Sequence, residues 1–369
     1  MQAAVLRDPA QGMQIEELRT PRPKEGEVLV KVSACGMCHS DLHVLEGAIA
    51  FPTPCVLGHE VAGELVELGP HNEQLDLEVG DRVAGVFLMP CGRCEACAMG
   101  RDDLCAPFFD MNRLKGQLYD GTTRLRTLDG EDVWMYSMGG LAEYCVIPST
   151  SIAKLPEDAD PVAGAILGCA AMTAYGAVRR GADLRHGQTV AVVATGGVGS
   201  NVIQIAKAFG AKQIIGVDIA DEKLAAAMEL GATHTINSAK EDVRERTLEL
   251  TNGRGVDVAF EVLGRPETWN SALSTLADGG KMVPIGLGAG VQTAEVEINR
   301  TVRRSQSIIG SYGAHTRQDL PEVVRMASQG IIGYRQIVSK KFSLRDVAKG
   351  YRELKAGKIR GRAVVDMSL

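Results

Sequence analysis

The segment at residues 190–218 constrains the fold more than any other part of the chain. It reads VAVVATGGVGSNVIQIAKAFGAKQIIGVD: a β-branched run, a glycine-rich turn, an apolar-periodic stretch over 199–209 and a second β-like run. A strand, a helix and a strand in this order form a βαβ unit with two parallel strands. The glycines of the turn let backbone N–H groups at the start of the helix approach a pyrophosphate; they are Gly196, Gly197 and Gly199.

Asp218 stands at the end of the second β-like run, nineteen residues after Gly199. A carboxylate at this place accepts hydrogen bonds from a ribose 2′-hydroxyl and repels a 2′-phosphate, which favours NAD over NADP. The usual fingerprint begins with a glycine, which Ala194 replaces here. We expect this change to alter the turn only slightly, because alanine tolerates most of the conformations needed. The sequence therefore predicts NAD binding.

The chain shows two kinds of sequence pattern, one after the other. Over residues 188–313, β-like runs alternate with helical periods, as in a parallel, doubly wound sheet. We expect helices over 199–209, 221–230 and 266–278. Residues 1–160 instead hold short β-like runs broken by glycine and proline, which predicts a partly open antiparallel β domain. The tail over 314–369 is too small for its own core and should pack on this first domain.

The composition excludes several classes of partner. A chain of 369 residues with a formal net charge of −6 has no positive field for nucleic acid or anionic lipid. The first residues lack the features of a secretory signal. The most apolar stretch, 163–178, is shorter than the roughly 20 residues that cross a bilayer. We therefore expect a cytoplasmic protein of two domains, without nucleic acid or membrane partners.

Four of the nine cysteines fall in one short polar stretch, CGRCEACAMGRDDLC at 91–105, with the spacing C-x2-C-x2-C-x7-C. In a reducing compartment such thiols are more naturally metal ligands than a disulfide framework. Four thiolates this close in sequence suit a closed tetrahedral zinc, which braces a loop and leaves no position for a substrate. The alternatives are an iron–sulfur cluster and unliganded thiols. The predicted ligands are Cys91, Cys94, Cys97 and Cys105.

A second group of potential ligands is dispersed along the chain. A catalytic zinc takes three protein ligands from Cys, His and carboxylates and keeps a fourth position for water or substrate. Cys38, His59 and Cys169 meet that need. Each residue alone is weak evidence, because a single buried cysteine or histidine is more often structural. Cys35 and Cys38 also form a C-x2-C pair, but no βαβ pattern surrounds them, which disfavours a redox role.

The order of these motifs resembles the zinc-containing medium-chain alcohol dehydrogenase family: Cys38, GHE at 58–60, the four-cysteine stretch, Cys169, and the glycine-rich turn with Asp218. The resemblance covers essentially the whole chain and implies a GroES-like catalytic domain together with a Rossmann domain. It places the catalytic domain at 1–168, completed by 313–369, and the dinucleotide-binding domain at 169–312. The family's glycine pattern is disturbed at 69–81, where we expect a small insertion.

The resemblance also implies a role for each matching residue. Cys38, His59 and Cys169 match the catalytic zinc ligands, and the four clustered cysteines match a structural zinc site. Glu60 lies beside the metal, and Asp41 orients the histidine ligand. The remaining matches are a proton relay of Ser40 and His43, pyrophosphate contacts from His39 and Arg362, and adenosine-ribose contacts from Lys223 and Asp218.

By the same resemblance, the chain is a zinc-dependent alcohol dehydrogenase or aldehyde reductase with NAD as cofactor and two zinc ions per chain. Zinc acidifies a bound alcohol, the alkoxide expels hydride toward the nicotinamide, and the relay passes the proton to a histidine that exchanges with solvent near neutrality. The last apolar strands, KMVPIGL and QSIIGSYG, could extend a sheet across a two-fold axis, as in related enzymes. We therefore expect a homodimer or homotetramer.

The family's substrate wall matches GEDVWMYSMGGLAEY at 130–144, where Trp134, Met135 and Tyr136 are the bulky residues. An apolar wall with no nearby Arg or Lys favours an uncharged primary alcohol or aldehyde of medium size. Alternatively, Trp134 packs the domain interior, as tryptophan often does.

Two other functions compete with this one. The first is a sister subclass on the same scaffold: a polyol, threonine or glutathione-adduct formaldehyde dehydrogenase. The glutathione type uses a pocket acid and a pocket Arg, and Ile49 and Phe109 stand at the matching positions. The second is an NAD-binding sensor without turnover, which would need neither an open zinc nor a proton relay.

Overall fold

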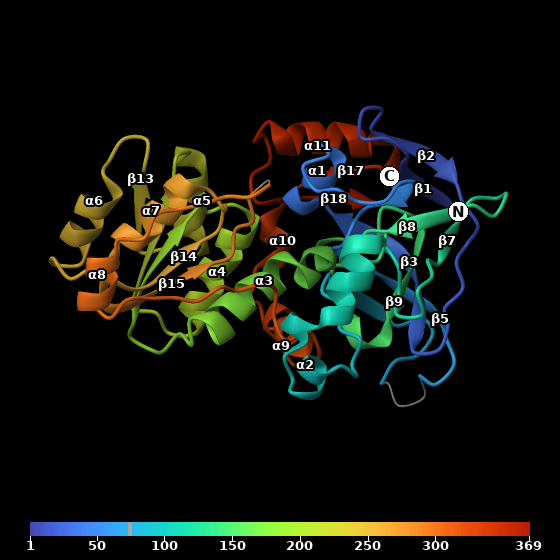
Figure 1. Cartoon of the computed structure of the whole chain (residues 1–369), viewed down its shortest axis with the longest axis horizontal. Coiled ribbons are helices and arrows are strands. Elements are labelled where there is room, and N and C mark those ends of the chain that lie inside the picture. Colours follow the sequence, from blue (N-terminus) through green and yellow to red (C-terminus); the bar gives the residue numbers. More distant parts are fainter. Residues whose placement is uncertain (73–75, 289) are drawn as a thin grey trace. The chain divides into compact units, whose positions relative to one another are not determined.

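The computed structural model describes residues 1–72, 76–288 and 290–369. The chain divides into two compact units, each described here by itself (Figure 1). Unit 1 comprises Met1–Met172, His315–Ser328 and Tyr334–Leu369, and unit 2 comprises Thr173–Ala314 and Gln329–Gly333. Within the described residues, every helix is too short or too polar to cross a membrane.

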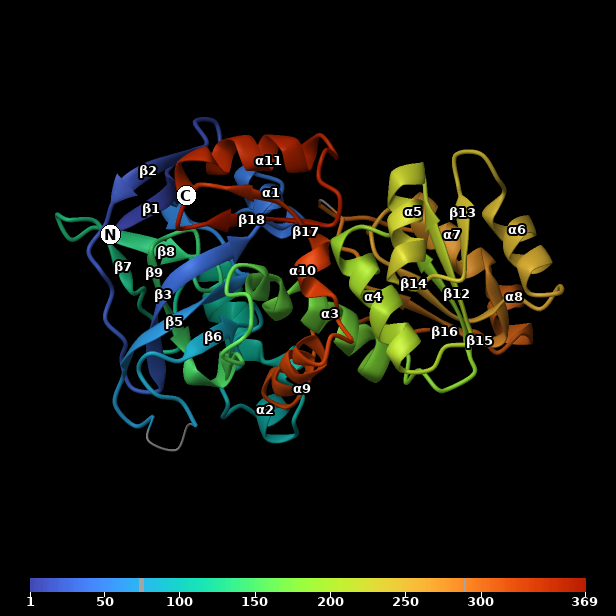
Figure 2. The same ribbon diagram turned by 180° about the vertical axis from the view of Figure 1, so that it is seen from behind.

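Unit 2 is built on one sheet of six parallel strands. Their order in the sheet is β13 (His234–Asn237), β12 (Gln213–Asp218), β11 (Thr189–Val193), β14 (Val256–Glu261), β15 (Leu276–Pro284) and β16 (Ser307–Ile308). In chain order this is 3-2-1-4-5-6, the arrangement of a doubly wound nucleotide-binding sheet. The helices are α4 (Gly197–Ala208), α5 (Asp221–Leu230), α6 (Val243–Leu250), α7 (Pro266–Ser274) and α8 (Ile298–Arg303) (Figure 2). The parallel, doubly wound sheet predicted from the alternation is confirmed.

One expected helix is too long. The periodicity predicted a helix over 266–278, but α7 ends at Ser274 and β15 begins at Leu276. Thr275 ends the helix, because its hydroxyl donates to the Ala272 carbonyl and its own carbonyl accepts from Val256 N–H at the start of β14. The apolar residues after 274 therefore belong to a buried strand, which periodicity over so few positions does not distinguish from a helix.

Unit 1 holds a seven-stranded sheet that is antiparallel except at one edge. Its order is β10 (Ile152–Lys154), β6 (Arg82–Gly85), β5 (Val61–Leu68), β3 (Glu27–Gly36), β18 (Arg362–Asp366) and β17 (Val338–Phe342), and β9 (Tyr144–Pro148) also pairs with β3. The first half of β3 pairs with β9 and its last residues pair with β18. The tail is thus part of the first sheet, and its red ribbon lies among blue strands in Figures 1 and 2.

A second sheet of unit 1 carries the expected substrate wall. Its order is β2 (Met13–Glu17), β1 (Gln2–Leu6), β4 (Cys55–Val56), β8 (Asp132–Met135) and β7 (Leu125–Arg126). The α-helices that begin in unit 1 are α1 (His39–Leu45), α2 (Glu95–Ala98), α3 (Ala170–Gly176), α9 (Thr316–Ser328), α10 (Tyr334–Ile337) and α11 (Val347–Lys355). The mainly antiparallel β domain expected for this part of the chain is confirmed.

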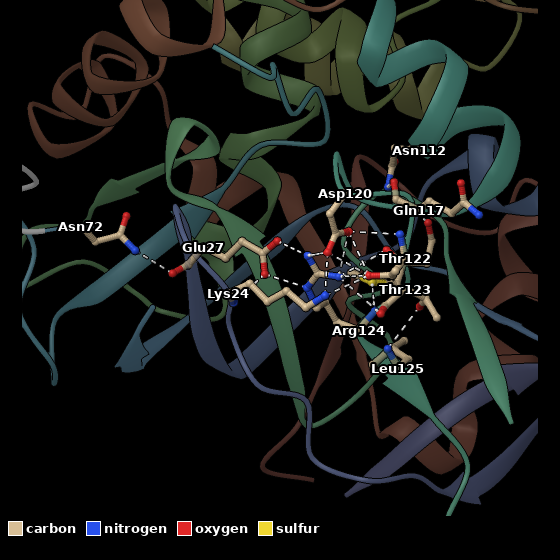
Figure 3. A network of polar contacts seen from close by, with 11 residues as sticks. Lys24, Glu27, Asn72, Asn112, Gln117, Asp120, Thr122, Thr123, Arg124 and Leu125 are labelled. Atoms are coloured by element: carbon tan, nitrogen blue, oxygen red, sulfur yellow. Dashed lines mark hydrogen bonds and ion pairs between the residues drawn. The ribbon is translucent and has the colours of Figure 1, made fainter. Parts of the chain in front are cut away.

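A buried polar network holds the turn before β7 (Figure 3). The Arg124 guanidinium donates through Nε to Glu27 Oε2 at 2.8 Å and through Nη1 to Asp120 Oδ1 at 3.2 Å. Its side chain is only 4% exposed. Asn72 Nδ2 donates to the Glu27 carbonyl at 2.8 Å, next to the segment where a small insertion was expected at 69–81. Residues 73–75 of that segment lie outside the described residues.

Candidate functional site

Three cysteine and histidine side chains and one carboxylate converge in the interior of unit 1. Cys38 ends the loop after β3, His59 and Glu60 precede β5, and Cys169 follows the 3-10 turn Ala163–Gly168. One potential ligand atom from each lies within 4.8 Å of the others, and all four residues are buried. A hydrogen bond from Cys169, helped by nearby positive charge, lowers the pKa of Cys38 well below its usual value. The cluster could therefore hold a divalent metal through a thiolate.

Asp41 fixes the orientation of the His59 ring. Its Oδ1 lies 3.0 Å from His59 Nδ1 and accepts a hydrogen bond from Gly58 N–H at 3.0 Å. Burial alone would lower the pKa of His59, but the charges of Asp41 and Cys38 raise it to about 10. With Nδ1 engaged by the carboxylate, Nε2 is the ring nitrogen left for a metal.

Glu60 makes a fully buried ion pair with a residue from the far end of the chain. Arg362 Nη2 donates to Glu60 Oε1 at 2.6 Å and lies 3.7 Å from the Cys38 sulfur. Burial raises the pKa of Glu60 to about 7, although the guanidinium opposes the rise. Oε2 has no hydrogen-bond partner among the described residues, and a Cβ at Gly36 would lie only 2.1 Å from it. Arg362 thus lies at the ligand cluster; its expected contact with a pyrophosphate stays a prediction.

The residues expected to relay a proton share the short helix α1. Ser40 and His43 are three positions apart, so they lie on one face of the helix, and both are half-buried. The Ser40 hydroxyl is 3.7 Å from the Cys38 sulfur, while His39, the first residue of α1, is exposed. The geometry brings Ser40 to the ligand cluster and places His43 about one turn further along α1.

Aromatic rings surround the His59 imidazole. The centroid of the Tyr136 ring lies 5.9 Å and that of Phe87 6.0 Å from the His59 centroid, both edge to face. Phe51 packs edge to face on Tyr136 at 5.1 Å. Such arrangements are the favoured ones for ring quadrupoles. The cluster therefore has a rigid aromatic side, of which only Tyr136 was expected from the sequence.

The expected wall residues are placed differently from one another. Tyr136 is fully buried at the cluster, and its hydroxyl donates to the Ser40 carbonyl at 3.4 Å. Met135 is also buried, and its sulfur accepts from Arg124 N–H. Trp134 is half-buried, and its Cβ and the Phe51 ring both flank Gly116. Of the three, Tyr136 is the residue whose ring packs against a candidate ligand, the His59 imidazole, in the described part of the chain.

The expectation of a wall without a nearby Arg or Lys is wrong. Arg113, at the end of the π-helical turn Phe108–Arg113, places its guanidinium carbon 4.3 Å from the centroid of the Tyr136 ring. The charge lies over the negative face of the ring, which is a favourable cation–π contact. Arg113 lies twenty-three positions before Tyr136 in the sequence, so no local pattern connects the two residues.

The four clustered cysteines form a second, separate group in unit 1. One sulfur from each lies within 4.8 Å of the others, and the sulfur of Cys105 accepts from Cys91 N–H at 3.2 Å. Burial opposes ionisation of Cys94, but hydrogen bonds from Cys97 and its neighbours lower the pKa of Cys94 to about 7. Four thiols at this spacing are the donor set of a closed tetrahedral site.

An ion pair between the buried Asp102 and the exposed Arg317 ties this cysteine loop to α9. Asp102, 1% exposed, accepts from Arg317 N–H at 2.9 Å and from Arg317 Nη2 at 2.8 Å. The same guanidinium donates to the carbonyl of Cys97. The loop and the start of α9 therefore hold each other in place.

The glycine-rich turn of unit 2 connects β11 to α4. Gly196 caps the helix, and a Cβ there would meet no atom within 4 Å, which leaves the backbone open to a ligand. At Gly199 a Cβ would lie 2.1 Å from the Ala194 carbonyl oxygen, so only glycine fits. Ala194 itself has φ of 75°, in the left-handed region. Alanine was expected to tolerate most of the conformations that this turn needs, but at this positive φ the Cβ of an L-residue is crowded, so Ala194 is strained.

Asp218 is held at the end of β12 beside this turn. Its Oδ2 accepts from Thr195 N–H at 2.9 Å, and its Oδ1 accepts from Ile219 N–H at 2.9 Å. The Lys223 amine lies 3.9 Å from Oδ1. The carboxylate is thus oriented by backbone donors from both sides, at the edge where doubly wound sheets bind nucleotides.

Two family models match the chain, in agreement with this geometry. The alcohol dehydrogenase GroES-like domain matches residues 24–157, and the zinc-binding dehydrogenase matches residues 197–329. An alcohol dehydrogenase of Geobacillus stearothermophilus is 35% identical over 371 residues, covering 100% of this chain and 99% of the relative. The chain belongs to the zinc-containing medium-chain alcohol dehydrogenase family.

Other members of this family are similar over their whole length. The NDMA-dependent alcohol dehydrogenase of Amycolatopsis methanolica is 34% identical over 97% of both chains. An alcohol dehydrogenase zinc-binding domain protein of Burkholderia ambifaria has a TM-score of 0.92 and 32% identity, covering 99% of this chain and 98% of its own. Benzyl alcohol dehydrogenase of Acinetobacter calcoaceticus has a TM-score of 0.91 and 29% identity over the same shares.

Three residues at the ligand cluster escaped the sequence analysis. Phe51 and Phe87 contribute rings, and Arg113 contributes a charge. Phe51 lies eight residues before His59, in a loop that contains prolines. Such a loop has no core in which to bury an aromatic ring, so the sequence could have indicated that Phe51 packs at the site. Phe87 reads as one more buried residue of a strand end, and Arg113 as a solvent-facing charge.

Proposed function

We propose that the chain is an oxidoreductase that transfers a hydride between NAD(H) and a primary alcohol or aldehyde at a zinc ion. The observation that carries this proposal is the buried convergence of Cys38, His59 and Cys169, with ligand atoms within 4.8 Å of one another. Two thiols and one imidazole are a known ligand set of alcohol-oxidising zinc sites, which keep a fourth position for substrate. The family membership and the names of its relatives support the same activity.

The residues present fit two zinc ions per chain. The open site has a thiolate favoured at Cys38 and an unpartnered Glu60 oxygen, so its donors suit a divalent cation. The closed site offers four thiols and no carboxylate. When bound at the open site, zinc supplies Lewis acidity that makes a coordinated alcohol easier to deprotonate.

The residues of α1 supply the proton pathway. Ser40, close to Cys38, accepts the proton of the alcohol, and His43 on the same helix face delivers it to solvent. Asp41 keeps His59 Nδ1 engaged, which holds the ring in one orientation during the reaction.

The cofactor proposal rests on unit 2. The open backbone at Gly196 and the N-terminus of α4 suit a pyrophosphate, and the oriented Asp218 carboxylate suits a ribose with a free 2′-hydroxyl. Lys223 beside Asp218, and His39 and Arg362 in unit 1, complete the proposed contacts. The functional division proposed is a catalytic domain of 1–168 with 313–369 and a cofactor domain of 169–312.

The proposed substrate is an uncharged primary alcohol or aldehyde of medium size, with an aromatic ring as its best-fitting group; the Arg113 charge beside the wall is engaged by the Tyr136 ring. Tyr136 and Phe87 stack edge to face on His59, and Phe51 extends that surface. A solved relative is a benzyl alcohol dehydrogenase. The proposed setting is the cytoplasm, and the proposed assembly is a homodimer or homotetramer through the exposed edge strand β16.

One experiment tests activity and cofactor together. NADH formation from benzyl alcohol should exceed that from ethanol, NADP should be a poor substitute, and a zinc chelator should abolish turnover. Because one relative is NDMA-dependent, each alcohol is also assayed with NDMA as the acceptor. Metal analysis should find two zinc ions per chain in active protein. Equal rates with sorbitol or threonine, or a strict need for glutathione, would assign the chain to a sister subclass, and no turnover of any alcohol would favour a sensor.

A further inference from the structure

The Asp41 carboxylate, which orients His59, has one oxygen without a hydrogen-bond donor among the described residues. Oδ1 of Asp41 lies 3.0 Å from both His59 Nδ1 and Gly58 N. Oδ2 is fully buried and makes no hydrogen bond to any residue that the structure describes. A buried carboxylate oxygen without a donor costs free energy and leaves the group less firmly oriented.

A buried hydroxyl group that can donate a hydrogen bond to this oxygen lies nearby. The Tyr351 side chain, on α11, is 1% exposed, and its hydroxyl also lacks a hydrogen-bond partner among the described residues. Helix α11 packs against α1, which carries Asp41. Burial, reinforced by the nearby Asp41 charge, raises the pKa of Tyr351 well above its usual value. The phenol therefore keeps its proton and remains a donor.

The sequence allows this close approach at one position. A Cβ at Gly350 would lie 2.5 Å from the Cε atom of Met37, so α11 passes close to the segment that leads into Cys38. Met37 N–H in turn donates to the Ala363 carbonyl at 2.9 Å, which anchors the same segment to β18. Tyr351 follows Gly350 directly, and its buried side chain lies close enough to Asp41 to be influenced by the Asp41 charge.

We propose that Tyr351 is a positioning residue of the candidate catalytic metal site, with its hydroxyl donating to Asp41 Oδ2. Asp41 then has a donor on each oxygen, and the contacts from Tyr351 through Asp41 to His59 hold the ring so that its Nε2 atom is presented to the metal. Outer partners of this kind hold a ligand in the binding orientation before the metal arrives. This inference rests on the proposed function, because it presupposes that His59 binds a metal.

The test compares Tyr351→Phe with a matched control in the metal-loaded protein. Tyr334→Phe removes another nearly buried phenol of unit 1, whose oxygen accepts from Asp160 N–H. Zinc affinity at the open site is measured by competition with a chelator, and the absorption spectrum is recorded after cobalt replaces zinc there. Loss of a direct partner of a metal ligand costs about 10–100-fold in affinity, so a partner one residue further out should cost about 3–10-fold.

We expect Tyr351→Phe to weaken metal binding by that factor and to shift the cobalt spectrum, with Tyr334→Phe unchanged in both. Wild-type affinity and spectrum in Tyr351→Phe would overturn the proposal. A crystal structure of the zinc-loaded wild type gives an independent readout if the variant does not fold: a Tyr351 Oη to Asp41 Oδ2 distance near 2.7 Å supports it, and one above 3.5 Å overturns it. A wild-type protein with no metal at this site, or no alcohol turnover, would instead refute the proposed function.

Discussion

Ala194 occupies a backbone conformation that suits glycine, and this makes it a target for a simple substitution. A left-handed conformation costs an L-residue roughly 1–2 kcal/mol, and glycine avoids that cost while losing some entropy. Ala194→Gly should therefore raise the free energy of unfolding by up to about 1 kcal/mol, measured by urea denaturation. Ala225→Gly, at an exposed position inside α5, should lower it by about 0.5–1 kcal/mol. A destabilised Ala194→Gly would show that the turn is not strained.

Arg113 places a charge on the Tyr136 ring of the aromatic wall, so it tests whether the substrate is uncharged. Wild type should oxidise benzyl alcohol with a higher kcat/KM than 4-(hydroxymethyl)benzoate. In Arg113→Met the Tyr136 ring loses its cation–π contact, worth about 0.5–2 kcal/mol, so KM for benzyl alcohol should rise about 2- to 30-fold. Arg113→Lys serves as the charge-conserving control. A wild-type preference for the carboxylate that disappears in Arg113→Met would contradict the uncharged substrate class.

Residue identities predicted the ligand sets better than they predicted their surroundings. Cysteines and histidines at such spacings are chemically distinctive, so Cys38, His59 and Cys169 could be named together, and the structure brings them together. Glu60 and Arg362 were each flagged, but their ion pair spans 302 positions and no local pattern indicates it. The positive φ of Ala194 was equally hidden, because it depends on the crossover geometry.

The cysteine loop over 91–105 is expected to act as a metal-dependent brace for α9. Cys94→Ser should reduce the zinc content from two ions per chain to one and lower the thermal unfolding midpoint, since the loop anchors Arg317 through Asp102. Alcohol turnover should persist at low temperature, because the other ligand set is untouched. The control is Cys145→Ala, which removes a buried thiol outside both ligand sets and should leave two zinc ions. An unchanged midpoint in Cys94→Ser would show that the loop needs no metal.

The turn before β7 depends on the buried pair of Arg124 and Glu27. Arg124→Leu leaves the Glu27 carboxylate buried without its cation, which should cost about 3–5 kcal/mol in the free energy of unfolding. The double change Glu27→Leu with Arg124→Leu should cost less than the single one, because no uncompensated charge remains. Urea denaturation measures both, and Arg246→Ala, which breaks an exposed pair with Glu249, is the control without measurable loss. A single variant as stable as wild type would show that Glu27 is neutral or solvated.

The overall architecture was predictable to the extent that it depends on neighbouring segments. The alternation after residue 188 indicated a doubly wound sheet, because each crossover is local in sequence. The neighbours of β3 were not predictable in the same way, since β18 joins it from more than 300 positions away. Hydrophobic pattern identifies such strands but not their partners, so the sequence placed the tail with the first domain without giving its register.

The position of β18 sets the order in which the molecule can be assembled during synthesis. Most of unit 2 is one continuous run, Thr173–Ala314, so its sheet can form while translation continues. The central sheet of unit 1 cannot close before Arg362–Asp366 leaves the ribosome, because β18 lies between β3 and β17. Until then Glu60 lacks its ion-pair partner Arg362, and the edge of β3 that pairs with β18 stays exposed in the nascent chain. Under the proposed function, the metal site around Cys38 and His59 is therefore completed only near the end of synthesis.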